Sequence, residues 1–112
     1  MSMAARMREN GESMTHERVV ALAVADPGLY AQYRAEMTPL LEAAGGGFRY
    51  DFEVSRDLKP DGDPTINRVF VISFPSKAAM DAFFADPNYK EIRARLFTKA
   101  VARTISIAEY DV

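Results

Sequence analysis

Residues 74–89 read FPSKAAMDAFFADPNY, and this stretch decides how the rest of the chain is organised. It opens on the end of an apolar segment and a turn. Ser76 is a favoured N-cap residue, so we expect a helix to begin at Lys77. Apolar residues then recur at three- and four-residue steps, which gives that helix one apolar face. Asp86 and Pro87 end it and begin a second helix, because Asp caps well and Pro is favoured at the first helical position.

The two adjacent aromatic residues of the first helix, Phe83 and Phe84, point in directions about 100° apart. We therefore expect one of them to be deeply buried and the other to reach an edge or a pocket. The second helix should run from Pro87 to about Lys99. The residues expected to face inward from it are Tyr89, Ile92, Leu96 and Phe97.

Four segments alternate in the way typical of β-strands: 16–25, 48–56, 67–74 and 102–110. In the second of them, apolar Phe48, Tyr50, Phe52 and Val54 share one face and charged residues take the other. This pattern predicts an edge strand with one solvent-exposed face. The other three strands carry apolar residues on both faces.

Another helix is expected between the first two strands. Asp26 and Pro27 begin it, and three glycines at 45–47 end it, because glycine tolerates the left-handed conformation of a helix stop. Pro39 lies inside this helix and should kink it. Its apolar face consists of Tyr30, Tyr33, Met37, Leu40, Leu41 and Ala44.

The resulting order is strand, helix, two strands, helix, strand. This order predicts an α+β fold, the ferredoxin-like βαββαβ arrangement, with a four-stranded antiparallel sheet and both helices on one face. The other face would leave an apolar patch of several hundred Å² exposed, and the simplest cover is a second copy in a two-fold dimer. Residues 1–14 precede the first apolar run, so we expect an N-terminal extension followed by one domain at 15–112.

Composition excludes several classes of function. The 112 residues carry a net charge of −2, which favours neither nucleic acid nor a membrane surface as a partner. The absence of cysteine and the single histidine argue against a metal site. No apolar run is long enough to span a membrane, and no signal peptide is recognisable, so we expect a cytoplasmic protein.

Several of these residues together resemble a known family. They are Asp26-Pro27 with Tyr30 and Tyr33, the run from Arg68 to Ser76, the pair Phe83-Phe84, and Tyr89 with Arg93. The sequence resembles, over about residues 15–111, small bacterial proteins grouped as a domain of unknown function within the dimeric α/β-barrel superfamily. The resemblance implies a ferredoxin-like protomer and a homodimer whose sheets face each other, and it implies no established activity. The chain departs from the family pattern in the charged segment 49–68 and at Phe83, where a tryptophan is common.

A few polar side chains are candidates for chemistry. His16 is the one side chain whose ordinary pKa suits proton transfer near neutrality, although its place at a strand start predicts that it is exposed and inert. Arg68 either pairs with an anionic ligand or forms a salt bridge to an acidic residue of the neighbouring strand. The catalytic candidates are His16, Tyr33 and Arg68. The candidate ligand-binding residues are Tyr30, Tyr33, Tyr50, Arg68, Phe84 and Tyr89.

The sequence leaves three functions open. The protein binds a small apolar or aromatic molecule between helices and sheet, with the polar loop 57–64 as a lid. Alternatively, as the resemblance to this superfamily implies, it is a cofactor-independent enzyme on such a molecule, of monooxygenase or isomerase type, or it is a non-catalytic interaction module. No cofactor is implied. A pocket of roughly 300 Å³ or more, with Tyr33 or Arg68 pointing in, would favour a ligand, and a filled core would favour the interaction module.

Overall fold

Four strands form one antiparallel sheet in the order β2-β3-β1-β4 in the computed structural model, which describes residues 15–112. The predicted extension at 1–14 lies outside the described residues. The strands are β1 (His16–Val24), β2 (Gly47–Glu53), β3 (Arg68–Phe74) and β4 (Val101–Asp111). The helices are α2 (Pro27–Ala43), α3 (Lys77–Ala85), α4 (Pro87–Ile92), the π-helical turn η1 (Arg93–Phe97) and α5 (Thr98–Ala100).

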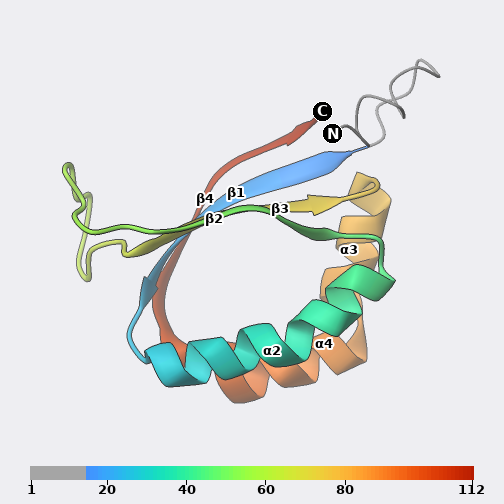
Figure 1. Cartoon of the computed structure of the whole chain (residues 1–112), viewed down its shortest axis with the longest axis horizontal. Helices are drawn as coiled ribbons and strands as arrows, with labels where there is room; N and C mark the ends of the chain where they lie inside the picture. Colours follow the sequence, from blue (N-terminus) through green and yellow to red (C-terminus); the bar gives the residue numbers. More distant parts are fainter. Residues whose placement is uncertain (1–14) are drawn as a thin grey trace.

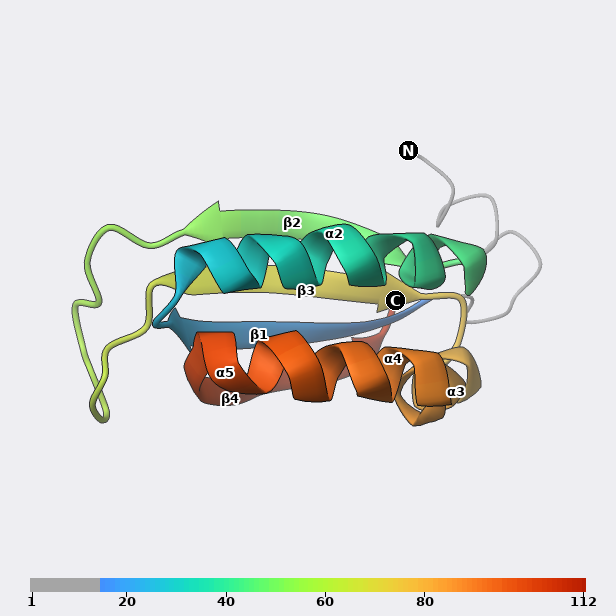
Figure 2. The same cartoon turned by 90° about the horizontal axis from the view of Figure 1, so that it is seen from below.

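The helices lie together on one side of the sheet (Figure 1). Seen from the helix side, α2 lies in front of β2 and β3, and α4 and α5 lie in front of β1 and β4 (Figure 2). Within residues 15–112, no helix covers the opposite side of the sheet. The order of elements and the layers confirm the predicted ferredoxin-like α+β fold.

The predicted helix starts are confirmed by their caps. The Asp26 carboxylate accepts from the backbone N–H of Leu29 at 3.1 Å, and the Ser76 hydroxyl accepts from that of Ala79 at 3.0 Å. Asp86 does the same for α4. Each cap satisfies a backbone donor that the helix leaves unpaired, and losing one typically costs about 1 kcal/mol.

The end of α2 depends on glycine as the sequence predicted. Gly45 has a φ of +82°, a conformation that other residues rarely adopt. Gly46 packs so closely under the sheet that a Cβ there would lie 2.7 Å from the carbonyl oxygen of Ser73. The turn therefore brings the chain directly from α2 into β2.

The core fills the space between the helices and the facing side of the sheet. Alternate strand residues such as Leu22, Ile72 and Phe74 point toward the helices and are buried, as the alternation predicted. On α3, Phe83 is buried and Phe84 is only half-buried, which confirms that the two rings diverge. Most of the apolar positions predicted for the helices belong to the same core: Tyr30, Tyr33, Met37, Leu41, Tyr89, Ile92 and Leu96.

The regular helix predicted over 87–99 is wrong at its centre. The chain widens into a π-helical turn over Arg93–Phe97 before one last α-turn. The backbone N–H of Thr98 bonds to the carbonyl of Arg93 five residues back, and the Thr98 hydroxyl also donates to that carbonyl at 3.2 Å. Such π-turns occur preferentially at functional sites.

The prediction that Phe48, Tyr50, Phe52 and Val54 share one face is also wrong. Phe48 is paired with Ile72, but Tyr50 is paired with Val71, so the register shifts between them. One extra residue in the strand reverses the alternation. Phe48 therefore faces the helices, Tyr50 and Phe52 face away, and Val54 lies beyond the end of β2.

A similar register shift occurs in β4. Ile105 is opposite Ala21, but the register then slips at Ile107, so that Ala108 rather than Ile107 is opposite Val19. The side of the sheet that no described helix covers is called here the open face. Its apolar residues are Val19, Ala21, Ala23, Tyr50, Phe52, Val69, Val71, Ile105, Ala108 and Tyr110, and its polar ones include Glu17, Ser73 and Arg103.

No helix among the described residues has the length and apolar character needed to cross a membrane.

Candidate functional site

A cleft of about 520 Å³ lies between the helices and the side of the sheet that faces them. More than half of the chain's phenylalanines and tyrosines line it, which is why we call it the aromatic cleft. These are Tyr30, Tyr33, Phe48, Phe70, Phe84, Tyr89 and Phe97. Neighbouring rings contact one another: Phe48 and Phe70 lie edge to face with centroids 5.2 Å apart, and Tyr30 and Tyr33 are stacked at 5.8 Å. A concave site with such walls suits a flat apolar ligand.

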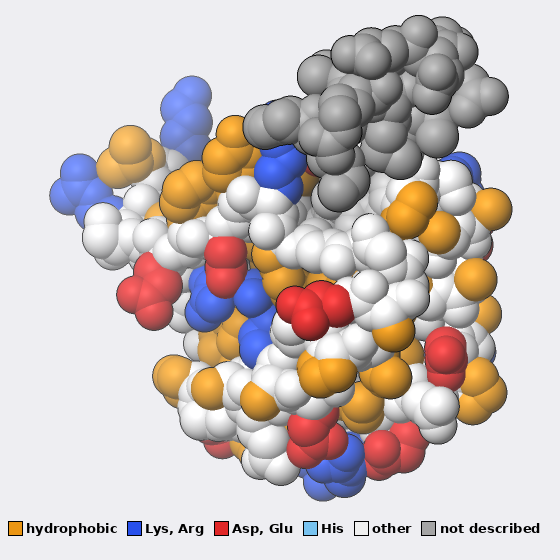
Figure 3. All heavy atoms as spheres, turned by 45° about the vertical axis from the view of Figure 1, so that its right-hand side comes forward, with side chains coloured by type: hydrophobic (Ala, Val, Ile, Leu, Met, Phe, Trp, Pro, Cys, Tyr) orange, Lys and Arg blue, Asp and Glu red, His pale blue; other side chains and the backbone are white. Residues whose placement is uncertain are grey.

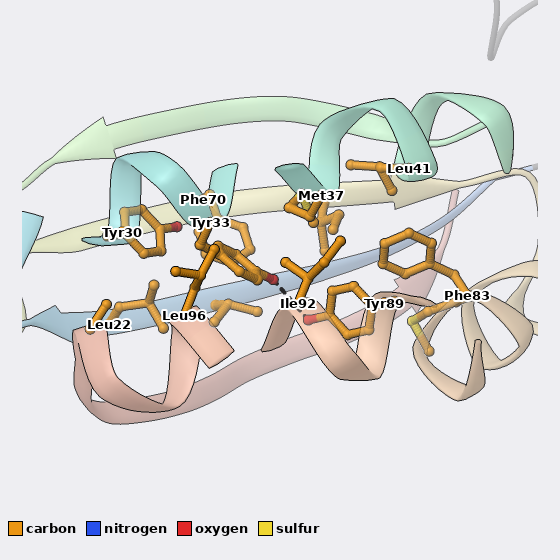
Figure 4. Close-up of a cluster of buried hydrophobic side chains, with 14 of the residues drawn as sticks. Leu22, Tyr30, Tyr33, Met37, Leu41, Phe70, Phe83, Tyr89, Ile92 and Leu96 are labelled. Atoms are coloured by element: carbon orange, nitrogen blue, oxygen red, sulfur yellow. Dashed lines mark hydrogen bonds between the residues drawn. The ribbon is translucent and has the colours of Figure 1, made fainter. Parts of the chain in front are cut away.

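Two tyrosine hydroxyls meet at the wall of this cleft. Tyr33 on α2 and Tyr89 on α4 point toward each other, and their oxygens lie 2.8 Å apart (Figure 4). Either hydroxyl can be the donor, so the bond uses one of the two available hydrogens. The other hydrogen remains for a further acceptor.

Both tyrosines are held neutral by their surroundings. Burial, together with the neighbouring Tyr89 hydroxyl, raises the pKa of Tyr33 far above its ordinary value. Burial also raises the pKa of Tyr89, against the opposing effects of the hydrogen bond to Tyr33 and of the nearby Arg93 guanidinium. These hydroxyls therefore act as hydrogen-bond donors rather than as bases.

Four basic residues line the cleft, and two of them are already paired. Arg18 binds the Glu109 carboxylate through two nitrogens at 3.0 and 3.1 Å. Arg34 binds Asp51. Within residues 15–112, Lys90 and Arg93 have no acidic partner within salt-bridge distance, so the cleft keeps excess positive charge.

Arg93 is the first residue of the π-helical turn and contacts its last residue. Its guanidinium carbon lies 4.9 Å from the centre of the Phe97 ring, at the other end of that turn, and both side chains line the cleft. Arg93 is exposed, so its charge is at the mouth of the cleft rather than in its interior.

A second cleft, of about 570 Å³, lies beside the first and shares Tyr30 and Arg34 with it. Here Asp51 bonds to Arg34 and to Arg68, each through two nitrogens at 2.9–3.1 Å. Burial alone would raise the pKa of Asp51, but the bonds from the two arginines outweigh it and lower the pKa. On the side shown in Figure 3, acidic and basic side chains gather beside a hollow between sheet and helices.

His16 is not exposed, contrary to the prediction. Only 5% of its surface is accessible, and both ring nitrogens bind carboxylates, Nδ1 to Asp111 at 2.7 Å and Nε2 to Glu109 at 2.8 Å. The prediction failed because the antiparallel pairing of β1 with β4 brings the two acids opposite and next to His16. His16 does not line either cleft.

The predicted site residues therefore separate into groups. Four of the candidate ligand-binding residues line the aromatic cleft: Tyr30, Tyr33, Phe84 and Tyr89. Arg68 lines the second cleft and forms the predicted salt bridge to a neighbouring strand, with Asp51 as its partner. Tyr50 lies on the open face, away from both clefts, because of the shift in β2.

The loop 57–64 does not lie over the aromatic cleft as a lid. None of its residues lines that cleft. Its described contacts lead elsewhere: Asp61 and the carbonyl of Pro64 accept from Arg103 on β4. Arg103 is opposite Ala23, so it belongs to the open-face side of the sheet.

Sequence reasoning missed three basic residues that shape the aromatic cleft. These are Arg18, Arg34 and Arg93. The position of Arg18 could have been predicted from the strand alternation, since it shares a face of β1 with buried Val20 and Leu22. Arg93 was noted only as part of the family resemblance, because nothing in residues 93–97 predicts the π-turn at which it lines the cleft. Among the described residues, no cluster of His, Asp and Glu is arranged to hold a metal ion.

Residues 18–110 match the model of a protein family described as "Domain of unknown function (DUF1330)". The chain belongs to this family, and the resemblance seen in the sequence is confirmed. No curated protein matches the chain.

Several solved structures share the fold. A protein of unknown function from Rhodopseudomonas palustris is 22% identical, with a TM-score of 0.69 over 96% of this chain and 88% of that one. A hydroxynitrile lyase from Passiflora edulis is 19% identical, with a TM-score of 0.60 over 90% of this chain and 95% of that one. A protein from Thermobifida fusca, described as dimeric and ferredoxin-like and of unknown function, is 13% identical, with a TM-score of 0.55 over 88% and 92% of the two chains. At these identities the likeness is one of fold.

Proposed function

We propose that this protein binds a small aromatic molecule in the aromatic cleft. The observation that supports this is the cleft itself, an unfilled volume of about 520 Å³ walled by aromatic rings beside the Tyr33–Tyr89 hydroxyl pair. A module that acted only through its surface would need no such volume in its interior. The volume lies within the range of sites that bind small molecules.

Catalysis without a cofactor is the weaker alternative. A monooxygenase or isomerase needs a base next to the substrate. Among the residues that line the cleft, Asp81 is the one carboxylate, and it is ion-paired with Lys77 at 3.0 Å. His16 is outside the cleft and both of its nitrogens are bonded. The hydroxynitrile lyase neighbour shares the fold at 19% identity, and a shared fold does not favour catalysis over ligand binding in this chain.

We further propose that the protein is a homodimer that buries the open face. Phe52 is 55% exposed and Tyr50 48% exposed on this face, and their rings stack at 6.0 Å. Large apolar patches of this kind mark interfaces. The neighbours described as dimeric and ferredoxin-like support the same arrangement for this chain.

Chemical-shift mapping tests the ligand proposal. Isotope-labelled protein is titrated with a panel of aromatic acids and quinones, and amide shifts are followed. Binding in the aromatic cleft should move the amides of Phe84, Tyr89 and Thr104, and leave those of Phe52 and Ile105 on the open face unchanged. Shifts confined to the open face, or no shift with any member of the panel, would refute the proposal.

A further inference from the structure

Three features meet at the mouth of the aromatic cleft. Arg93 has no acidic partner within residues 15–112. It lies close enough to the Tyr89 hydroxyl to influence its ionisation. Tyr89 in turn shares a hydrogen bond with Tyr33, and that pair has one hydrogen to spare. A guanidinium and a free O–H therefore lie at the same end of an apolar site.

We propose that this end of the cleft binds the carboxylate of an aromatic acid, with Arg93 as its charge partner and the tyrosine pair as its hydrogen-bond donor. This inference rests on the proposed ligand-binding function and names the ligand's class. The ring of such an acid would lie against the aromatic walls deeper in the cleft, and its charged group would remain near solvent.

Arg93 is a better partner for an anion than the other three basic residues of the cleft. Arg18 and Arg34 already bind carboxylates, Glu109 and Asp51. Lys90 is exposed, and a lysine is a point charge without the planar fork that matches a carboxylate. Arg93 offers that fork and is held by its contact with the Phe97 ring. This assignment differs from the sequence prediction, in which Arg68 was the charge partner. Arg68 lies in the second cleft and is bonded to Asp51.

A neutral ligand of the same shape separates charge recognition from ring binding. The probes are 2-naphthoate and its amide, 2-naphthamide, with dissociation constants measured by calorimetry at low salt. Arg93→Gln should weaken 2-naphthoate about tenfold and leave 2-naphthamide unchanged, because charge-assisted hydrogen bonds are the stronger ones. Arg95→Gln is the matched control. It removes the same charge from the same turn, but Arg95 is paired with Glu36 and Glu91 and does not line the cleft.

A second variant tests the tyrosine pair. The double variant Tyr33→Phe/Tyr89→Phe removes both hydroxyls and should weaken both probes by about threefold, since both probes carry an oxygen that accepts a hydrogen bond. If the double variant leaves both affinities unchanged, the donor role is wrong.

The outcomes distinguish this inference from the proposed function. If both probes bind in the cleft and Arg93→Gln affects neither or both equally, the carboxylate site is overturned and the aromatic-binding function stands. An equal loss of 2-naphthoate affinity in Arg95→Gln would mean that overall charge, not Arg93, attracts the acid. If neither probe binds the wild-type protein, both proposals fail.

Discussion

The hydroxyl oxygens of Tyr33 and Tyr89 lie 2.8 Å apart although the two residues are 56 positions apart in the chain. This bond joins α2 to α4 across the wall of the aromatic cleft (Figure 4). Both side chains are buried, at 5% and 3% exposure, so water does not readily replace this hydrogen bond when it is lost. The pair therefore contributes to stability as well as to the proposed site.

Removing one of these hydroxyls should leave the other buried and poorly satisfied. We expect Tyr33→Phe and Tyr89→Phe each to lower the free energy of unfolding by about 1–3 kcal/mol. The double variant should lose less free energy of unfolding than the sum of the two single losses, because it leaves neither hydroxyl buried without its partner. Urea unfolding of the four proteins measures this cycle. Strictly additive losses would show that the bond does not couple the two helices.

The two adjacent phenylalanines of α3 should differ in their effect on stability. Both rings contact Phe74 and Tyr89, but Phe83 is 5% exposed whereas Phe84 is half-buried at the cleft. Phe83→Ala should cost roughly 3–5 kcal/mol, and Phe84→Ala clearly less, because its cavity opens toward solvent. Thermal or urea unfolding compares the two. Losses under about 1 kcal/mol for both would mean that the helix face is wrongly assigned.

Periodicity and capping residues were sufficient to predict most of the fold. The caps at Asp26, Ser76 and Asp86 and the two-residue alternation of β1 and β3 are local signals, and the structure follows them. The predictions of the fold were wrong where one residue is added to a regular pattern. The extra residue in β2 moves Phe48 to the helix side, and periodicity has no marker for a bulge.

The candidate site was only partly predictable for a related reason. Tyr33 and Tyr89 were found because they lie on apolar helix faces. Their mutual bond was not, since it depends on how two helices pack on one sheet. His16 shows the same limit: a strand start predicts exposure, but the acids that bury it come from the far end of the chain. Contacts between distant segments are what the sequence alone did not reveal.

The open face should hold two copies together. Phe52→Glu places a charge within the apolar surface of the open face, where burial against a second copy would be costly. We expect the wild type to be a dimer at micromolar concentration by light scattering and Phe52→Glu to be a monomer. Leu58→Glu is the control, because Leu58 is 76% exposed but lies in the loop outside the sheet. A wild-type monomer whose melting temperature is unaffected by dilution would contradict the proposed assembly.

His16 should make the stability of the protein depend on pH above neutrality. Burial alone lowers the pKa of His16, but the hydrogen bonds to Asp111 and Glu109 outweigh it, so the pKa lies above its ordinary value of 6.5. The folded state thus binds the proton more tightly than the unfolded chain. The resulting stabilisation is fully present below pH 6.5 and is lost as the pH rises through the raised pKa.

Glu109, an acidic partner of His16, should make the free energy of unfolding rise with pH in the acid range. Its contribution can therefore be separated from that of His16. The hydrogen bonds from His16 and Arg18 lower the pKa of Glu109 below its ordinary value of 4.5, so its contribution is present above that pH and lost in acid. Urea unfolding at a series of pH values measures both. In His16→Gln, the decrease in the free energy of unfolding above pH 6.5 should become smaller. Part of the decrease at low pH should remain, because Arg18 still binds Glu109. An unchanged slope above pH 6.5 in His16→Gln would show that the histidine does not bind its proton more tightly in the folded protein.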